Sequence, residues 1–351
     1  MRLIALLCSI LTATIPTAAA AAEPAGERAV WRVSFDNDIV SQSDDGYTAG
    51  WSLERHSAAW DTWEGSRLSG FSRLVGRIVP GLGDDGEGGR LVRTAWGASQ
   101  IMQTPNEISD PSLQLDDVPW AGTLGLFGSW TAVDDRRLNA VQLYIGCMGP
   151  CSQADEIQTF VHEDLDLHVI PEGWHTQLDT EALVNLNYMV RRKVASSSSV
   201  GVRGAFAGDL SVGAQVGVGS FFNVADVSME LRWGWGLPEG FSTIPEPAGR
   251  GVVMDPTPAR PLGGWQVSFA LVPRYVYFAD VATLDGGSTA DGRYHPGIEY
   301  ESSVLQLVSE IRVQRGRLSV ILAHFNYEDD IILTSKGTTL EWSNLSVGFS
   351  F

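Results

Sequence analysis

The chain has 351 residues, of which 44% are apolar and 19% charged, with 24 basic against 42 acidic side chains. This apolar content excludes a disordered chain, and the 38 glycines exclude a coiled coil. A formal net charge of −18 argues against nucleic-acid binding, because binding to phosphate backbones requires clustered Lys and Arg. The length alone allows one large domain or two ordinary ones.

The N-terminal residues have the composition of a secretory signal peptide. Met1 and Arg2 give a positive start, residues 3–11 are largely apolar, and residues 18–22 are all alanine. We therefore expect cleavage near Ala22, which removes residues 1–22 and leaves residues 23–351 as one mature domain.

Two cysteines remain after that cleavage, Cys147 and Cys151, in the stretch Cys-Met-Gly-Pro-Cys. An exported protein meets an oxidising environment, and Gly149-Pro150 allows the sharp turn that a local disulfide needs. Two free thiols are equally compatible with the sequence, which leaves both states open.

After residue 22 no segment has the roughly 18 consecutive apolar residues of a membrane-spanning helix. The mean hydropathy is close to zero, which is also typical of membrane barrels, because their lipid-facing and lumen-facing residues alternate. The C-terminal segment alternates in this way, and it ends at Phe351, as bacterial outer-membrane barrels end at an aromatic residue. Its apolar positions are Leu345, Val347, Phe349 and Phe351, and its polar or small positions are Asn344, Ser346, Gly348 and Ser350.

Further alternating segments predict an all-β fold, a transmembrane antiparallel β-barrel of about 12 strands. Their polar positions include Arg, Glu and Asn, which a hydrated interior tolerates and the core of a soluble secreted β-sandwich, the alternative fold, does not. We keep 198–222 as one bent strand, because splitting it at Gly208-Asp209 would make the count odd. The expected strands are 29–40, 47–57, 91–102, 121–132, 138–148, 182–194, 198–222, 226–236, 264–280, 300–314, 318–327 and 340–351.

An even count places both termini on the periplasmic side, so the first strand runs outward. Two of the inner connections, 58–90 and 237–263, are long for periplasmic turns. The outer connections are then 41–46, 103–120, 149–181, 223–225, 281–299 and 328–339.

Standard catalytic motifs are absent, including a Gly-x-Ser-x-Gly elbow and a phosphate-binding loop. Ile157, Val161 and Leu165 recur at helical spacing, which predicts a short helix in the outer loop after the fifth strand. Gln158 and His162 are four residues apart and share one face of that helix.

Other polar residues gather at the same rim. Asn37 and Asp38 end the first strand, and Thr48 begins its neighbour, the second strand. A carboxylate that holds a hard cation, an amide donor and a histidine base suit ester hydrolysis by an activated water. Asn37 continues the apolar face of the first strand and Asp38 the other face. Either a bulge re-aims one of them or the site straddles the barrel wall.

The residues around this rim also resemble a known family. Phe35-Asp36-Asn37-Asp38 and the stretch Asp45 to Gly50 are similar to the opening motif of the outer-membrane lipid A 3′-O-deacylases. Later stretches are similar to that family in the same order along most of the mature chain. They are Gln100 to Pro105, Asp117-Val118-Pro119-Trp120-Ala121-Gly122, Gly149-Pro150 with Gln158 and Val161-His162, Pro171 to Leu178, and Glu181 to Tyr188.

The resemblance implies a twelve-stranded, calcium-dependent barrel of the bacterial outer membrane that removes the 3′-linked acyloxyacyl group of lipid A. Lipopolysaccharide of the outer leaflet is then its partner, without an obligate protein partner. It implies that Asn37 is the oxyanion-side amide, Asp38 the Ca²⁺ ligand and Thr48 a supporting hydroxyl. By the same resemblance, His162 is the general base, with Gln158 beside it.

The chain departs from the family pattern at three places. The family's lysine beyond the proline that follows the third strand has no counterpart in this chain, and Asp110 lies near that position. The family also has a glutamate after the histidine. Glu163 and His168 lie near that place, and neither is assigned to it. Val118 replaces a common arginine. These departures concern recognition of the substrate's phosphates, so a passive barrel (channel or structural) and a phospholipase-type esterase remain alternatives.

Overall fold

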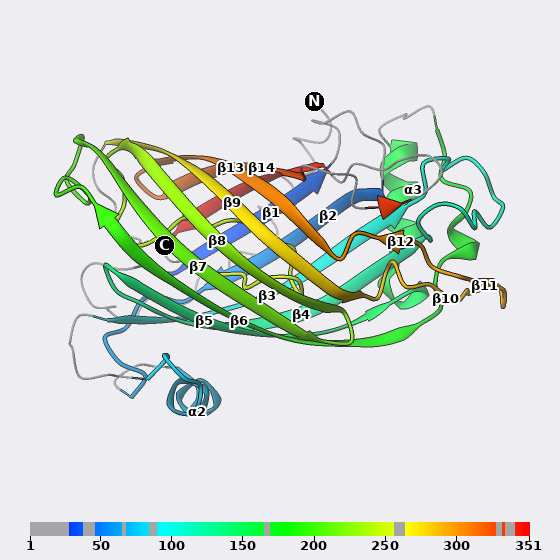
Figure 1. Cartoon of the computed structure of the whole chain (residues 1–351), viewed down its shortest axis with the longest axis horizontal. Coiled ribbons are helices and arrows are strands. Elements are labelled where there is room, and N and C mark those ends of the chain that lie inside the picture. Colours follow the sequence, from blue (N-terminus) through cyan, green and yellow to red (C-terminus); the bar gives the residue numbers. More distant parts are fainter. Residues whose placement is uncertain are drawn as a thin grey trace.

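The computed structural model describes residues 28–37, 46–64, 68–83, 90–164, 169–255, 264–327, 332–333 and 341–351. The expected signal peptide lies outside these residues. Twelve antiparallel strands close into one barrel (Figure 1), in the order β1-β16-β14-β13-β9-β8-β7-β6-β5-β4-β3-β2. The predicted fold class is therefore confirmed. The barrel strands are β1 (Val30–Asn37), β2 (Gly46–His56), β3 (Leu91–Thr104), β4 (Ala121–Val133), β5 (Arg137–Met148), β6 (Glu181–Ser196), β7 (Phe206–Gly219), β8 (Phe222–Trp235), β9 (Trp265–Val281), β13 (Ser303–Arg315), β14 (Leu318–Tyr327) and β16 (Trp342–Ser350).

Shorter elements lie in the connections. Their helices are α2 (Gly70–Ile78), α3 (Ala154–Asp164) and the 3-10 turns η1 (Pro150–Ser152) and η2 (Trp174–Thr176). Two small strand pairs join β10 (Gly287–Ser288) to β11 (Tyr294–His295), and β12 (Glu299–Tyr300) to β15 (Ile332–Leu333). Within the described ranges, no helix is long and apolar enough to cross a membrane.

The first and last strands close the barrel, in register from Val30 opposite Ser350 to Asn37 opposite Ser343. Side chains of β1 alternate between a buried lumen face and a more exposed outer face. On the lumen face, the Asn344 amide donates to Asp36 Oδ1 at 2.7 Å. The predicted alternation, apolar outside and polar inside, is confirmed. We call the end where β1 finishes the outer end, and the end where β1 begins and β16 finishes the inner end.

The strand bounds differ most from the expected ones at the seventh strand. Residues 198–205 form turns at the inner end, and β7 begins only at Phe206. The positive φ of Gly201 and Gly204 suits these turns and interrupts a strand there. The outer connection to β8 is then the tight turn at 220–221 instead of 223–225. The stretch 198–222 thus contributes one barrel strand, as predicted, but that strand is shorter.

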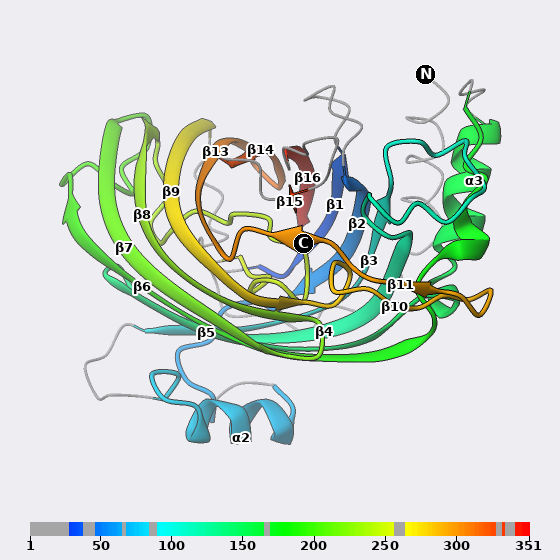
Figure 2. The same ribbon diagram turned by 45° about the vertical axis from the view of Figure 1, so that its right-hand side comes forward.

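The expected periplasmic connection 237–263 takes a different path, and residues 256–263 of it lie outside the described residues. Residues 236–255, here called the lumen segment, run inside the barrel (Figure 2), and every residue from 240 to 255 is buried. A polar lumen explains this path, because buried amides need partners. Gln142 donates to Gly251 O at 2.7 Å and accepts from Val253 N at 2.8 Å, as a neighbouring strand would.

Buried ion pairs tie the lumen segment to strands on several sides of the barrel. Arg32 of β1 contacts Asp255 at 2.7 Å, and the two side chains are 2% and 4% exposed. Arg274 of β9 pairs with Glu246. The Ser242 hydroxyl donates to Glu230 Oε2 at 2.7 Å. The lumen segment is therefore bound to strands β1, β8 and β9 from inside the barrel.

The Arg32–Asp255 pair gives a test of this packing. Asp255→Ala leaves the buried Arg32 guanidinium without its closest carboxylate, so we expect a loss of about 3 kcal/mol in the free energy of unfolding. Urea unfolding in lipid vesicles, followed by tryptophan fluorescence, measures the loss. The control Asp291→Ala removes an exposed pair with Arg293 and should cost less than about 1 kcal/mol. Equal losses in the two variants would contradict a buried lumen segment.

Candidate active site

Helix α3 lies against the outward face of the barrel wall at the outer end (Figure 2). Gly122 of β4 shares that outward face with Leu126, which is 67% exposed. A Cβ atom on Gly122 would stand 2.3 Å from Ala154 Cβ and from Ser152 Oγ. Only glycine allows this approach, so the start of α3 is seated directly on the wall.

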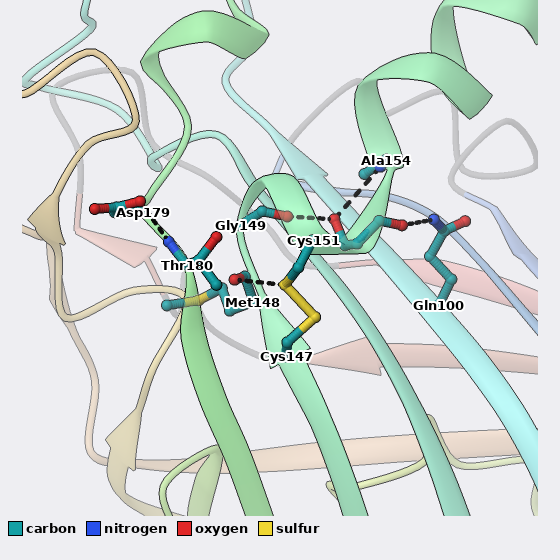
Figure 3. The surroundings of a disulfide bond; sticks show 9 residues. Gln100, Cys147, Met148, Gly149, Cys151, Ala154, Asp179 and Thr180 are labelled. Carbon is teal, nitrogen blue, oxygen red and sulfur yellow. Dashed lines mark hydrogen bonds between the residues drawn. A yellow bond between two sulfur atoms is a disulfide. The ribbon is translucent and has the colours of Figure 1, made fainter.

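The turn before α3 is anchored in several ways (Figure 3). Cys147, at the end of β5, and Cys151 in η1 form a disulfide. Gly149 between them has a φ of 92°, which favours glycine. The Gln100 amide of β3 donates to Ser152 O at 2.7 Å. Of the two cysteine states that the sequence allowed, the structure contains the disulfide.

A small apolar cluster joins α3 to the strand ends. Its buried members come from β3, α3 and the connections on either side, and two partly buried residues from β2 and α3 pack against it. They are Met102, Trp120, Ala154 and Trp174, with Ala49 and Ile157 at the edge. Through Ala49, the outer end of β2 contacts the cluster that holds the helix.

Gln158 is 4% exposed, and its orientation is set by Trp174. The Trp174 indole N–H donates to Gln158 Oε1 at 2.7 Å, and the Trp174 ring meets Trp120 edge-on at a centroid distance of 4.9 Å. An indole nitrogen only donates, so the contacted atom is the amide oxygen. The Gln158 Nε2 group, which has no hydrogen-bond partner within the described part of the chain, remains as a donor.

His162 lies one helical turn beyond Gln158 and is half-buried. Its Nδ1 atom is 2.6 Å from the carbonyl oxygen of Val169. A carbonyl only accepts, so Nδ1 carries the proton and Nε2 of the neutral ring keeps a lone pair. His162 is thus held in the tautomer that a general base at Nε2 requires.

The outer ends of β1 and β2 hold the remaining candidates. Asn37 is the last residue of β1 and pairs with Ala49 of β2. The register between β2 and β3 shifts between Tyr47 and Ala49, so Thr48 lies at a β-bulge. Asp38 lies outside the described residues, and for Thr48 the structure describes the backbone only.

These positions answer the question of parity at the rim for Asn37, while Asp38 lies outside the described residues. Asn37 follows the outward face of β1 without a bulge in that strand, and α3 lies outside the wall on the same side. Asn37, Gln158 and His162 therefore belong to the outer face of the barrel, while the irregularity falls on Thr48. The structure brings α3 and the ends of β1 and β2 together on the surface that faces lipid in a membrane.

Comparison with known proteins identifies the family. The model of the outer membrane protein LpxR family matches residues 4–351. The chain belongs to the LpxR family. The solved structure of LpxR from Salmonella typhimurium is 13% identical, with a TM-score of 0.68, and the match covers 92% of this chain and 100% of that one. The β-domain of the Bordetella autotransporter BrkA is 9% identical over 93% of this chain and 99% of that one, with a TM-score of 0.42. No curated protein sequence matches the chain.

As a member of the LpxR family, the chain is an outer-membrane β-barrel protein, and its departures from the family pattern have defined places. Val118 is fully buried in an apolar cluster with side chains of β9, β13 and β14, where a charged side chain would be costly to bury without a partner. Asp110 lies exposed in the loop between β3 and β4. Glu163 is exposed on α3, and His168 lies outside the described residues.

Sequence reasoning did not assign a role to Trp174 or Gln100. Trp174 orients Gln158 across 16 residues of an irregular connection. Gln100 joins two elements that are distant in sequence, since it also accepts from the Trp51 indole at 2.7 Å. The sequence offered one signal for Gln100. It lies among the outward-facing positions of β3, where an amide exposed to lipid would be unfavourable, so a polar partner there could have been expected.

An acidic pair at the same end gives the LpxR-family barrel a pH-dependent feature. Tyr300 donates to Asp285 Oδ1 at 3.1 Å. Partial burial of the Asp285 carboxyl, with a hydrogen bond to and repulsion from Asp280, raises the pKa of Asp285 from 3.8 to about 6. The folded state therefore binds this proton more tightly than the unfolded state, and its contribution to stability is lost as pH rises from 3.8 to about 6.

Asp285→Asn keeps the oxygen acceptor and removes the titration. We expect the variant to gain thermal stability relative to the parent protein as pH rises from below 3.8 to above 6. Melting temperatures in detergent, compared pair by pair across that range, measure the effect. Hydrogen bonds from Arg293 and Thr289 lower the pKa of Asp291, so Asp291→Asn should not show this gain. A pH-independent difference for Asp285→Asn would contradict the interpretation.

Proposed function

We propose that this LpxR-family barrel is a calcium-dependent carboxylic ester hydrolase that removes the 3′-linked acyloxyacyl chain of lipid A. The observation that carries the proposal is the position and tautomer of His162. It belongs to a helix seated on the lipid-facing side of the wall, and its Nδ1 donates to a main-chain carbonyl. A lipid substrate in the outer leaflet would reach that side laterally, without entering the lumen.

His162 would act as the general base. Its Nε2 lone pair would take a proton from a water molecule, and the resulting hydroxide would attack the ester carbonyl carbon. The Val169 carbonyl would keep the ring oriented and stabilise the imidazolium that forms. Collapse of the tetrahedral intermediate would break the bond to the sugar 3′ oxygen, which would take the proton back from His162. The products are the free acyloxyacyl acid and a 3′ hydroxyl.

Two amides would support this reaction. Asn37 ends β1 on the face that carries α3, where its side chain would donate to the developing oxyanion. Gln158 is buried and oriented by Trp174, so its amide would position the substrate or the water without first losing conformational freedom. The resemblance assigns Asn37 the oxyanion role and places Gln158 beside the base.

Calcium fits the donor set at the end of β1 and β2. Asp38 directly follows Asn37, and Thr48 lies at the bulge beside Ala49, so the ion would be offered carboxylate, hydroxyl and main-chain oxygens, which Ca²⁺ prefers. Asp38 would be the charged ligand, with Thr48 in support. A bound calcium ion would stabilise negative charge on the ester oxygen. Within the described residues, no three His, Cys, Asp or Glu side chains form a metal site, and Asp38 lies outside them.

The lumen argues against the alternative of an open channel. The lumen segment is held inside the barrel by buried side chains of β1, β5 and β9, where it would obstruct passage. The phospholipase alternative differs only in the lipid that reaches that surface, so it is an outcome of the first test below.

The proposal is tested by His162→Ala. Loss of a general base lowers the rate by about 10²- to 10⁴-fold, and we expect that loss when purified protein is mixed with lipid A and calcium. Mass analysis should show release of one acyloxyacyl unit by the parent protein. Glu156→Gln is the matched control, because Glu156 is exposed on the first turn of the same helix.

Two results would overturn the proposal. If lipid A has the same acylation by mass after treatment with the parent protein and with His162→Ala, the enzymatic interpretation would be rejected. If the protein cleaves glycerophospholipid and leaves lipid A intact, the phospholipase hypothesis would replace the deacylase hypothesis.

Calcium dependence is tested separately with Asp38→Asn. Chelation should abolish activity of the parent protein, and added calcium should restore it. Loss of a charged ligand should raise the calcium concentration for half-maximal activity by at least about tenfold, since even outer-shell changes cost 10- to 100-fold. An unchanged calcium requirement in Asp38→Asn would exclude this residue as the ligand.

A further inference from the structure

The connection between β2 and β3 lies on the outer surface of the barrel wall near the inner end (Figures 1 and 2). Three outward-facing side chains of the wall are almost fully buried there: Val92 at 4% exposure, Trp130 at 2% and Val141 at 5%. Each adjoins a side chain that bonds to the lumen segment, which fixes its outward direction. They pack with Trp63 and Val75 of the connection, so protein replaces lipid on this part of the wall.

Helix α2 is the regular part of this connection, and one of its faces is fixed to the wall. Ser72, Val75 and Gly76 are buried on that face. The Trp130 indole donates to Ser72 Oγ at 3.0 Å. A Cβ atom on Gly76 would stand 2.5 Å from the Trp63 ring. The helix therefore packs against Trp63 of the same connection as closely as a glycine permits.

A second face of α2 is apolar and exposed. Phe71 is 52% exposed, Leu74 50% and Ile78 65%, and their spacing of three and four residues places them in one stripe. Arg77 lies on another side of the helix, with its side chain 67% exposed, and pairs with Glu64. A helix with a wall face, an apolar stripe and a charged side has the pattern of one that lies in a membrane interface.

The apolar stripe continues the lipid-facing surface of the barrel. Trp96 of β3 is 46% exposed on the outer face of the wall. Its ring meets Trp130 edge-on at 5.5 Å, and Trp130 meets Phe71 edge-on at 5.5 Å. Three rings thus run without interruption from the wall onto α2, and a bilayer that covers Trp96 meets the stripe next.

We propose that α2 is a membrane-interface helix that binds phospholipid. Acyl chains at the inner-end leaflet cover Phe71, Leu74 and Ile78, and the side that carries Arg77 faces headgroups and water. The helix extends the lipid contact of the barrel beyond its strands, at the end opposite α3.

The test places a fluorescent nitrobenzoxadiazole label on Leu74→Cys and, as a matched control, on Arg77→Cys. The variants comprise residues 23–351, which leaves out Cys8, and Cys147 and Cys151 are joined in a disulfide that does not react without reductant. Both variants are reconstituted into phosphatidylethanolamine–phosphatidylglycerol vesicles, and heat-modifiable gel mobility confirms that their barrels are folded. Lipids brominated in the acyl chains quench from within the bilayer, and iodide quenches from water.

We expect brominated lipid to quench the label at 74, and iodide quenching there to be at least about fivefold weaker than at 77, because interfacial helices bury their apolar face about 5–10 Å deep. Equal iodide quenching at both positions would overturn the proposal. Protection of position 74 from both quenchers would overturn it as well, because protein instead of lipid would then cover the stripe.

Discussion

The two-residue period of side chains in a closed sheet is the constraint on which the rest of this structure depends. Once β1 pairs with β16, every strand side chain belongs either to the lumen or to the outer surface. The lumen face carries arginines, carboxylates and amides that are buried and therefore need partners. The lumen segment supplies them, with Asp255 beside Arg32 and main-chain groups beside Gln142. The lumen segment therefore satisfies polar groups of the wall from inside the barrel, while the candidate residues described above lie on its outside.

The candidate active site uses the outside. The start of α3 can lie directly on the barrel wall because Gly122 has no side chain at that point. The disulfide and the bond from Gln100 to Ser152 then fix the direction of the helix. The orientation of His162 follows from that anchoring together with the Val169 carbonyl. The geometry that suits a general base is thus a consequence of packing at a distance from it.

Much of the fold could be predicted from the sequence, because alternation is a local property. It located all twelve strands, and helical spacing located α3 with Gln158 and His162 on it. The path of residues 236–255 was not predictable in the same way, since it depends on partners such as Arg32, which is more than 200 residues away. The start of β7 was predicted wrongly for a local reason, because the turns at 198–205 interrupt a stretch that the even strand count had kept as one strand. Family resemblance pointed to Asn37, Asp38 and Thr48, but not to the indole of Trp174 that orients Gln158.

The two helices on the outside of the barrel show how one structural solution serves two different purposes. Each is fixed to the wall by specific contacts, α3 by the close approach of Ala154 to Gly122 and α2 by the hydrogen bond from Trp130 to Ser72. They differ in the side chains that they carry beside that contact. Helix α3 holds the Gln158 amide, oriented by Trp174, and an imidazole whose Nδ1 donates to a main-chain carbonyl, groups that gain from partial exclusion of water because electrostatic interactions strengthen there. Helix α2 presents Phe71, Leu74 and Ile78, which exchange no protons and gain only from leaving water. The polarity of these side chains therefore separates the helix that we propose supports chemistry from the one that we propose contacts lipid.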